Sequence, residues 1–356
     1  MISLFLAGMC LVNDEFPGVQ SSRCVGTSRL RSKTSRGERL ANENFARRPR
    51  GERASQRELR GSRSRYRLDF AHSIPHFYVT LPHHQLLTIM NHTTAHSASN
   101  TALITGASSG IGRELALVHA ARGGNMVLVA RRMAELQELK AQIESAHKVQ
   151  VVIIAKDLSE PHAAREVYEQ VQSMNLHIDV LMNNAGFGTL GEFASADVQT
   201  SLNMIHVNIT ALVELTRLFV PHMIARKAGR ILNVASTAAF QPGPLMAIYY
   251  ATKSFVVSFS EALRYELRHT GVTVTSLCPG PTLSEFQTVA GMNNIAMMSM
   301  PGIPTSRTVA EYGYNAMLRG KGIAVQGTMN KISSFSTRFM PRALLLRFVA
   351  ALQSSR

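Results

Sequence analysis

The chain has 356 residues, of which 45% are hydrophobic and 17% charged, so it has enough apolar material to bury the core of one large domain or two. Its formal net charge of +15 at first suggests a nucleic-acid or acidic-membrane partner. No run of about 18 apolar residues is present, which argues against a membrane-spanning helix. The three cysteines form no CxxC pair, so we expect a reducing compartment and no disulfide.

Residues 1–98 differ in composition from the rest of the chain. Residues 1–90 hold 15 Lys and Arg against 7 Asp and Glu, so they carry about half of the net charge. Between Arg23 and Arg67 no apolar periodicity is long enough to bury a face, and we therefore expect a disordered basic extension. An organelle transit peptide and an arginine tract that binds nucleic acid are alternatives. We favour the interpretation that the segment is not a natural part of the protein, and we expect no nucleic-acid partner.

From about residue 100 short apolar runs alternate with amphipathic stretches. The predicted strands are 101–105, 126–130, 149–155, 178–182, 230–234 and 272–277. The predicted helices are 111–122, 133–146, 161–174, 205–225 and 249–269. Strands that are apolar on both faces and separated by helices indicate a parallel sheet covered on both sides. We therefore predict one doubly wound α/β domain over residues 99–328, followed by a tail at 329–356.

A glycine-rich turn joins the first predicted strand to the first predicted helix. Its residues, which apart from Ala107 we assign to cofactor binding, are Thr105, Gly106, Ala107, Ser108, Ser109, Gly110, Ile111 and Gly112. Gly106 permits the tight bend, Gly110 lets the backbone approach a pyrophosphate, and Gly112 allows close packing of the helix. The N–H groups at the helix start attract negative charge. Such a turn alone is a weak signal, but the strand before it and the helix after it favour a dinucleotide site.

The end of the second predicted strand bears on the choice of cofactor. An acidic residue there accepts from the ribose 2′-OH of NAD and repels a 2′-phosphate. This chain has Arg131 and Arg132 instead, and guanidinium groups form charge-assisted bonds with phosphate. We therefore expect NADP(H) in preference to NAD(H). The alternative is that one of the two arginines only faces solvent on the following helix.

Polar and small residues follow the third and fourth predicted strands. The carboxylate of Asp157 could accept from an adenine amino group, with Leu158 packed beside the ring. Asn184, Ala185 and Gly186 suit a backbone that passes close to a cofactor. For either set alone, a capping or turn role is an equally good interpretation.

Four polar residues form a predicted proton-transfer site. Tyr249 and Lys253 are four residues apart and share one helix face. The phenol, with an ordinary pKa near 10, can give a proton to a carbonyl oxygen, and a neighbouring ammonium would favour the phenolate. Ser236 would donate to the substrate oxygen, and Asn208 could order a water that links Lys253 to solvent. An isolated Tyr-x-x-x-Lys is more often a surface pair. Tyr250, about 100° further round the helix, should point elsewhere.

From about residue 100 to 290 the chain resembles a classical short-chain dehydrogenase/reductase. The matching motifs are Thr105-Gly106-x-x-x-Gly110-x-Gly112, Asp157, Asn183-Asn184-Ala185-Gly186, Asn208, Ser236, Tyr249-x-x-x-Lys253 and Pro279-Gly280. The resemblance implies a seven-stranded Rossmann sheet, NAD(P)-dependent reduction of a ketone or oxidation of a secondary alcohol, and a tetrad. The implied tetrad is Asn208, Ser236, Tyr249 and Lys253. The resemblance also implies that Pro279, Gly280 and Thr282 flank the nicotinamide.

Two later segments bear on substrate and partners. Residues 283–304 lie where this family places its mobile substrate lid, and they include Met292, Met297, Met298 and Met300. Methionine there favours a lipophilic substrate, such as a 3-oxoacyl chain or a steroid, although methionine as plain filler is as common. Residues 338–352 form a basic amphipathic helix that would lie on an anionic membrane or dock on a neighbouring subunit. We expect a cytoplasmic homo-oligomer, a dimer or tetramer, with membrane contact through this tail as an option.

The sequence thus predicts an NADP(H)-dependent oxidoreductase acting on CH–OH groups, with Tyr249 as the acid/base. One alternative is a Rossmann-fold cofactor sensor or regulatory protein without turnover. The intact Asn, Ser, Tyr and Lys argue against it, because a sensor does not need a proton donor. The other alternative is a nucleic-acid binder that uses residues 23–67. Histidine and cysteine show no cluster at ligand spacing, so we expect no metal.

Overall fold

The computed structural model describes residues 100–292 and 302–353. The expected basic extension at 1–98 lies outside the described residues, and so do Met297, Met298 and Met300 of the expected lid. Within the described part, strands and helices alternate as the sequence predicts.

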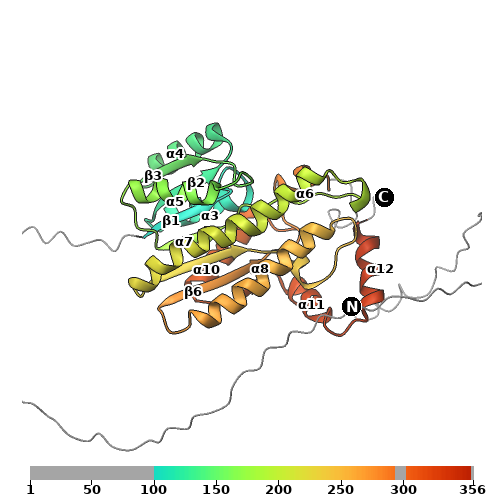
Figure 1. Ribbon diagram of the computed structural model, residues 1–356. Helices are drawn as coiled ribbons and strands as arrows, with labels where there is room; N and C mark the ends of the chain where they lie inside the picture. Colours follow the sequence, from blue (N-terminus) through green and yellow to red (C-terminus); the bar gives the residue numbers. More distant parts are fainter. Residues whose placement is uncertain (1–99, 293–301, 354–356) are drawn as a thin grey trace, which may run out of the picture. The chain divides into compact units, whose positions relative to one another are not determined.

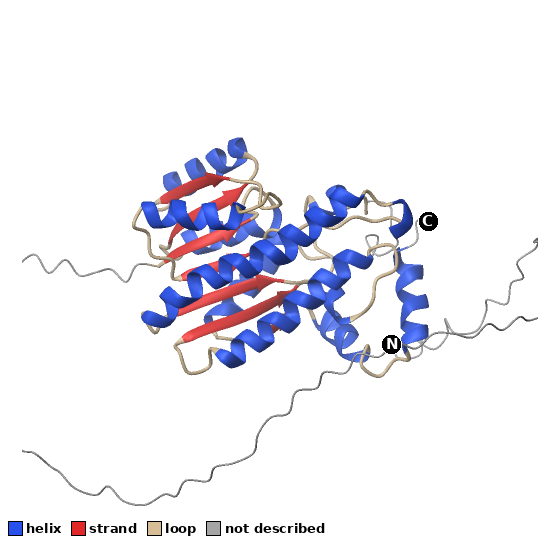
Figure 2. Ribbon diagram, viewed as in Figure 1, coloured by secondary structure: helices blue, strands red, loops and turns tan. Residues whose placement is uncertain are grey.

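Seven strands form one sheet in which every pairing is parallel (Figure 2). The strands are β1 (Thr101–Thr105), β2 (Asn125–Ala130), β3 (Val151–Ala155), β4 (Val180–Asn183), β5 (Gly229–Val234), β6 (Val272–Cys278) and β7 (Ile323–Val325). Their order is β3-β2-β1-β4-β5-β6-β7, so the direction of winding reverses between β1 and β4. In sheets of this kind ligands bind at the carboxyl ends of the strands beside that reversal.

Helices cover both faces of the sheet (Figure 1). One face carries α3 (Gly110–Ala120), α4 (Met133–Ala146) and α10 (Ser306–Leu318). Their side chains, for example Leu115 and Leu139, share one buried apolar cluster with the sheet. The other face carries α5 (Ala163–Ser173), α7 (Leu212–Ala225) and α8 (Ala247–Glu266). Val167, Phe219 and Val274 belong to a second cluster on this side. The two clusters fix the sheet rigidly and leave its carboxyl edge for the site.

The long helix before β5 begins earlier than the sequence predicts. It starts with α6 (Val198–Ile205), passes through a π-helical turn (His206–Ala211) and continues as α7. The Asp197 side chain accepts a hydrogen bond from the backbone N–H of Thr200 at 2.7 Å and caps the first turn. The first turns carry Val198 and Leu202 at helical spacing, but both side chains are exposed in the structure.

The same helix bears on the expectation about membrane spans. Val198–Ala225 is 28 residues long and has a mean hydropathy of 1.2 over an 18-residue stretch, which by length and composition alone would be sufficient for a span. Leu215, Phe219 and Met223 are buried against the sheet. Their packing against β-strands accounts for this hydropathy, as it does in a core helix.

The chain after β6 contains elements that the sequence analysis did not locate. They are a short helix α9 (Phe286–Val289), α10, β7 and α11 (Thr328–Ser336). β7 has only three residues, too few for a periodic pattern. The last helix, α12 (Arg342–Gln353), corresponds to the helix expected at 338–352, and it begins directly after Pro341.

Candidate active site

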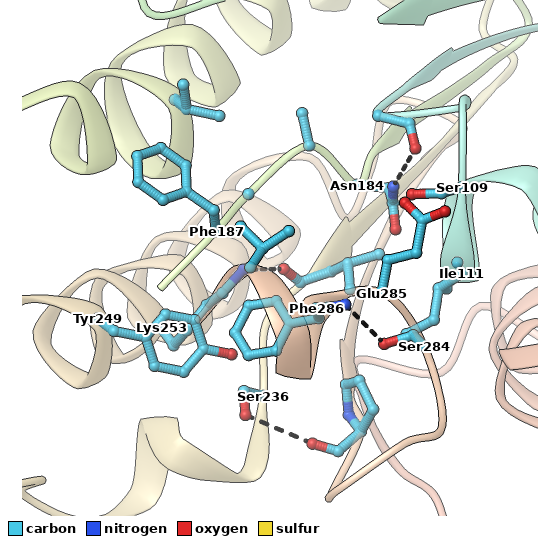
Figure 3. A pocket seen from close by; sticks show the side chains of 18 of the residues that line it. Ser109, Ile111, Asn184, Phe187, Ser236, Tyr249, Lys253, Ser284, Glu285 and Phe286 are labelled. Carbon is cyan, nitrogen blue, oxygen red and sulfur yellow. Dashed lines mark hydrogen bonds between the residues drawn. The ribbon is translucent and has the colours of Figure 1, made fainter. Parts of the chain in front are cut away.

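A pocket of about 480 Å³ lies at the carboxyl edge of the sheet, where the direction of winding reverses between β1 and β4. It is lined by the glycine-rich turn and by residues that follow β2, β3, β4, β5 and β6 (Figure 3). The predicted residues that line it are Gly106, Ser108, Ser109, Gly110, Ile111, Arg131, Arg132, Asp157, Leu158, Asn184, Ala185, Gly186, Ser236, Tyr249, Lys253, Pro279, Gly280 and Thr282. Three other predicted site residues do not line the pocket, namely Thr105, Gly112 and Asn208.

The glycine-rich turn has a shape that only glycine allows at two positions. Gly106 has a φ of +65°, and a Cβ there would lie 2.8 Å from the Asn184 amide nitrogen. A Cβ on Gly112 would lie 2.2 Å from the backbone oxygen of Gly106. At the start of α3, the Ser109 side chain makes no capping hydrogen bond. Ser109, Gly110 and Ile111 at this helix start line the pocket, and backbone N–H groups at a helix start can donate to an anion such as the pyrophosphate of a dinucleotide.

The side chains of Thr105 and Asn184 each form a hydrogen bond with the backbone of the other residue, and only Asn184 lines the pocket. The Thr105 hydroxyl oxygen accepts from the backbone N–H groups of Asn184 and Ala185, each at 3.0 Å. The Asn184 amide nitrogen donates to the backbone oxygens of Thr105 and Gly106 at 2.9 and 3.2 Å. These bonds tie the glycine-rich turn to the end of β4. The two residues thus set the spacing of the strand ends on which a cofactor would lie.

Both arginines after β2 lie at the pocket, and each has an acidic neighbour. The Arg131 guanidinium is 3.6 Å from the Asp157 carboxylate. Burial raises the pKa of Asp157, but hydrogen bonds from Ser159 and the charge of Arg131 outweigh it, so the net shift is downward. Arg132 lies 3.3 Å from the Ser108 hydroxyl and 3.0 Å from the Glu285 carboxylate. Both arginines are exposed to solvent as well as lining the pocket, and their role towards a cofactor stays a prediction.

Tyr249 lies against Ser236 in the apolar part of the pocket. Figure 3 shows its hydroxyl directed towards Ser236. Burial raises the pKa of Tyr249 to about 12, although a hydrogen bond with Ser236 acts in the opposite direction. The phenol therefore keeps its proton throughout the neutral range. This protonation state suits a group that gives a proton to a carbonyl oxygen.

Lys253 lies on the same face of α8 as Tyr249, with its Nζ 5.8 Å from the centre of the phenol ring. It donates to the backbone oxygen of Val234 at 2.9 Å (Figure 3). Burial lowers the pKa of Lys253 to about 8. The lysine does not bring the pKa of Tyr249 below its ordinary value, as the sequence interpretation expected, because burial has the larger effect on the phenol.

Asn208 lies in the π-helical turn, and its side-chain amide is fully bonded to the protein. Its oxygen accepts from the backbone N–H of Phe187 at 3.1 Å. Its nitrogen donates to the Phe187 oxygen and to the Thr252 hydroxyl, each at 3.0 Å. A Cβ on Gly186 would lie 3.0 Å from the Asn208 oxygen and 3.2 Å from Lys253 Nζ. Asn208 therefore holds the chain after β4 close to the lysine, and π turns of this kind often occur at functional sites.

Tyr250 does not point away from the site, contrary to the expectation. It lines the same pocket, and its ring centre is 6.0 Å from that of Tyr249. Its hydroxyl accepts a hydrogen bond from the Gln353 amide at 2.5 Å. This bond comes from the last turn of α12, a contact that the position angle on one helix cannot show.

Several other pocket residues were not singled out from the sequence. They are Phe187, Gln241 and Met246, whereas Ser284, Glu285, Phe286, Gln287, Val289 and Met292 also line the pocket and fall within the lid expected at 283–304. The Phe286 ring lies 5.4 Å from that of Tyr249 (Figure 3). Phe187, Gln241 and Met246 are in segments without a motif, and the only signal for Phe187 was its position directly after Gly186.

The family model described as short chain dehydrogenase matches residues 100–294, which is more than half of the chain. 17-beta-hydroxysteroid dehydrogenase type 3 of Mus musculus is 37% identical over 186 residues, 51% of this chain and 60% of that protein. Very-long-chain 3-oxoacyl-CoA reductase-B of Danio rerio is 37% identical over 191 residues, 52% of this chain and 60% of that protein. The chain spans about three fifths of the length of these curated relatives.

A solved structure supports the same comparison. The short-chain dehydrogenase from Sphingobium yanoikuyae in complex with NADPH superposes with a TM-score of 0.61 and 29% identity. The match covers 67% of this chain and 93% of that chain. Another solved structure, the 3-ketoacyl-(acyl-carrier-protein) reductase from Brucella melitensis complexed with NADH, is 29% identical to this chain. A nicotinamide dinucleotide therefore fits the fold, and the choice between the phosphorylated and unphosphorylated forms depends on local residues.

Proposed function

Because the chain belongs to the short-chain dehydrogenase family, we propose that it is an NAD(P)-dependent oxidoreductase that interconverts a ketone and a secondary alcohol. The observation that carries the proposal is the convergence of Tyr249, Ser236 and Lys253 in one pocket with the glycine-rich turn. A bound nicotinamide would supply the hydride. The residues of this chain supply binding, orientation and the proton.

Each reacting residue has a role that follows from its surroundings. Tyr249, with its pKa of about 12, donates its proton to the carbonyl oxygen of the substrate. Ser236 donates to the same oxygen and holds it beside the phenol. Lys253, buried and four residues after Tyr249, stabilises the phenolate left after transfer when its ammonium is charged. Asn208 fixes the wall beside Lys253 and is a positioning residue.

We propose NADP(H) as the preferred cofactor. Arg131 and Arg132 lie at the end of β2, at the pocket and close to Ser108 and Asp157. A 2′-phosphate at this position would meet two guanidinium groups, which form stronger bonds with phosphate than with a hydroxyl. Glu285 and Asp157 neutralise part of this charge in the structure, so the phosphate would compete with two carboxylates.

A lipophilic substrate suits the other half of the pocket. Around Tyr249 the lining is apolar and aromatic, with Phe187, Met246, Phe286 and Met292. The names of the relatives indicate a steroid substrate for one and a long-chain 3-oxoacyl substrate for the other. We propose a substrate of this class, a ketone carried on a bulky apolar body.

We propose that the protein is a cytoplasmic homo-oligomer. Val213, Leu218 and Phe255 line a shallow apolar groove on the outer side of α7 and α8. Phe255 is 39% exposed and stacks on Phe259. Burial of this groove against a second copy would remove apolar surface from water, which favours a subunit contact.

The experiment that tests the proposed function is a substrate panel. The full chain is supplied with NADPH or NADH and with short ketones, aldehydes, steroid ketones and 3-oxoacyl thioesters, and cofactor oxidation is followed. We expect turnover with the bulky apolar ketones and faster turnover with NADPH. Binding of NADPH without turnover on any member would favour the cofactor-sensor alternative, and faster turnover with NADH would contradict the cofactor assignment.

A further inference from the structure

Large apolar side chains are exposed along α11, α12 and the residues between them. They are Met329, Ile332, Phe335, Phe339, Leu344, Leu346 and Phe348. Phe339 is 75% exposed and Met329 66%. Exposed leucines and phenylalanines scattered singly are ordinary, but seven within 20 residues of sequence form a concentration that monomeric soluble domains rarely carry.

The same segment is basic and has no acidic residue. After Glu311 the sequence contains no Asp or Glu to its end. Lys331, Arg338, Arg342 and Arg347 are all exposed, and within the described residues none of the four makes an ion pair. We call the seven apolar and four basic residues together the tail surface.

Apolar and basic residues of the tail surface are neighbours on the helices. Lys331 and Phe335 are four residues apart on α11, and Arg347 is three residues after Leu344 on α12, so in each pair the side chains lie close together. The Arg338 guanidinium lies 5.8 Å from the centre of the Phe335 ring. A surface built of exposed apolar side chains bordered by cations has the chemistry of the interface of an anionic bilayer.

The opposite side of α12 is fixed to the body of the protein. Leu345 and Val349 are buried in the cluster that contains Tyr249 and Tyr250, and Gln353 is bonded to Tyr250. The inner side of α12 therefore holds this helix in place. The apolar side chains on its outer side remain exposed while the inner side is packed. Figure 1 shows α11 and α12 beyond the end of α8 that begins at Ala247, the end that carries Tyr249.

We propose that the tail surface docks on an anionic lipid bilayer. A second copy of the chain fits it less well, because a face-to-face pairing would bring the four cations of each copy together with no carboxylate on either side. Phospholipid headgroups provide the missing negative charge, and the acyl boundary accepts the phenylalanines.

The position of the tail surface has a consequence for substrate supply, which rests on the proposed function. The inner side of α12 packs in the same cluster as Tyr249 and Met246, so a docked bilayer would lie on the opposite side of this helix from the apolar half of the pocket. A lipophilic ketone dissolved in the membrane would thus reach the pocket over a short path. Docking itself does not depend on turnover, so the two are tested separately.

The test is binding of the full chain to vesicles of phosphatidylcholine alone or with phosphatidylserine, measured by co-sedimentation. We expect binding to the phosphatidylserine vesicles that weakens as salt rises. The double substitution Phe335→Ser and Phe348→Ser should weaken it about tenfold, since both rings enter the interface. The triple substitution Arg338→Gln, Arg342→Gln and Arg347→Gln should reduce binding by a similar factor only on the anionic vesicles.

A matched control is Phe193→Ser with Tyr265→Ser, two exposed aromatic residues elsewhere on the protein, which should leave vesicle binding unchanged. All variants keep the basic residues 1–98, so any drop belongs to the tail surface. Unchanged binding of the Phe335 and Phe348 variant would overturn the proposal. It would also be overturned if light scattering without vesicles showed that this variant breaks an oligomer, since the surface would then be a subunit contact. Cofactor oxidation by each variant in vesicle-free buffer checks that the fold is retained.

Discussion

The cofactor end of the pocket is built from residues that follow strands directly, whereas the substrate end is built from segments that the sheet does not place. At the cofactor end, the residues after β1, β2 and β3 meet because parallel strands end at one edge. At the substrate end, Phe187 comes from the segment after β4, Met246 from the segment before α8, and Phe286 and Met292 from the segment after β6. Sheet topology alone thus assembles the dinucleotide end of the pocket, whereas the shape of the substrate end depends on packing between distant segments.

The largest expected effect lies where the two ends meet. Replacement of Tyr249 by Phe removes the proton donor, and we expect turnover to fall about a thousandfold while NADPH binding, measured by fluorescence titration, is unchanged. Tyr250→Phe is the matched control, because Tyr250 is the next residue, lines the same pocket and has no assigned proton. It should keep most of the turnover. Equal losses in the two variants would contradict the role assigned to Tyr249.

The second prediction breaks the cofactor end alone. Gly112→Ala places a methyl group 2.2 Å from the Gly106 backbone oxygen, so the turn must shift. We expect NADPH affinity to fall about a hundredfold. Gly123→Ala is the control, since a Cβ there meets nothing within 4 Å and only the positive φ is unfavourable. Calorimetric titration measures the NADPH affinity of the two variants. Equal affinities for NADPH would show that the shape of the glycine-rich turn is not required for binding.

The third prediction concerns the charge balance at the cofactor end. Arg132→Ala should weaken NADPH about tenfold and leave NADH nearly unchanged, because only NADPH carries the 2′-phosphate. Glu285→Gln should act in the opposite direction, since it removes the carboxylate 3.0 Å from Arg132. Dissociation constants of both cofactors check this, and a parallel loss of NADH binding in the Arg132 variant would argue against phosphate recognition.

The fourth prediction is a pH dependence. Burial lowers the pKa of Lys253 to about 8, so the ammonium is present below that pH and is lost as pH rises through it. Tyr249, with a pKa of about 12, remains protonated over the same range. We expect the kcat/KM of ketone reduction to decline above pH 8, approaching about tenfold per pH unit. A profile that is flat to pH 10 would exclude the ammonium form from the mechanism.

The smallest effect is expected at the substrate end. Gln353 is buried at the last residue of α12. The substitution Gln353→Leu removes its hydrogen bond to Tyr250 and keeps a side chain of similar volume. We expect a severalfold rise in KM for a bulky ketone with unchanged affinity for NADPH, because Tyr250 loses the contact that orients it. An effect on the cofactor alone would contradict the division between the two ends.

The difference between the cofactor end and the substrate end of the pocket also explains which features could be predicted from the sequence. The order of strands and helices and the position of the glycine-rich turn follow from periodicity and local geometry. The pocket positions of Ser236, Tyr249 and Lys253 follow from the family motif. The orientation of Tyr250 was predicted wrongly and the contact of Glu285 with Arg132 was not predicted, because their partners Gln353 and Arg132 are 103 and 153 residues away in the chain.

The measurement that tests the account most directly is a crystal structure of the full chain with NADP and a ketone from the active panel. The account predicts the pyrophosphate at the start of α3, the 2′-phosphate between Arg131 and Arg132, and the ketone oxygen within about 3 Å of both the Tyr249 and Ser236 hydroxyls. A ketone oxygen out of reach of Tyr249, or a nicotinamide bound away from this pocket, would contradict it.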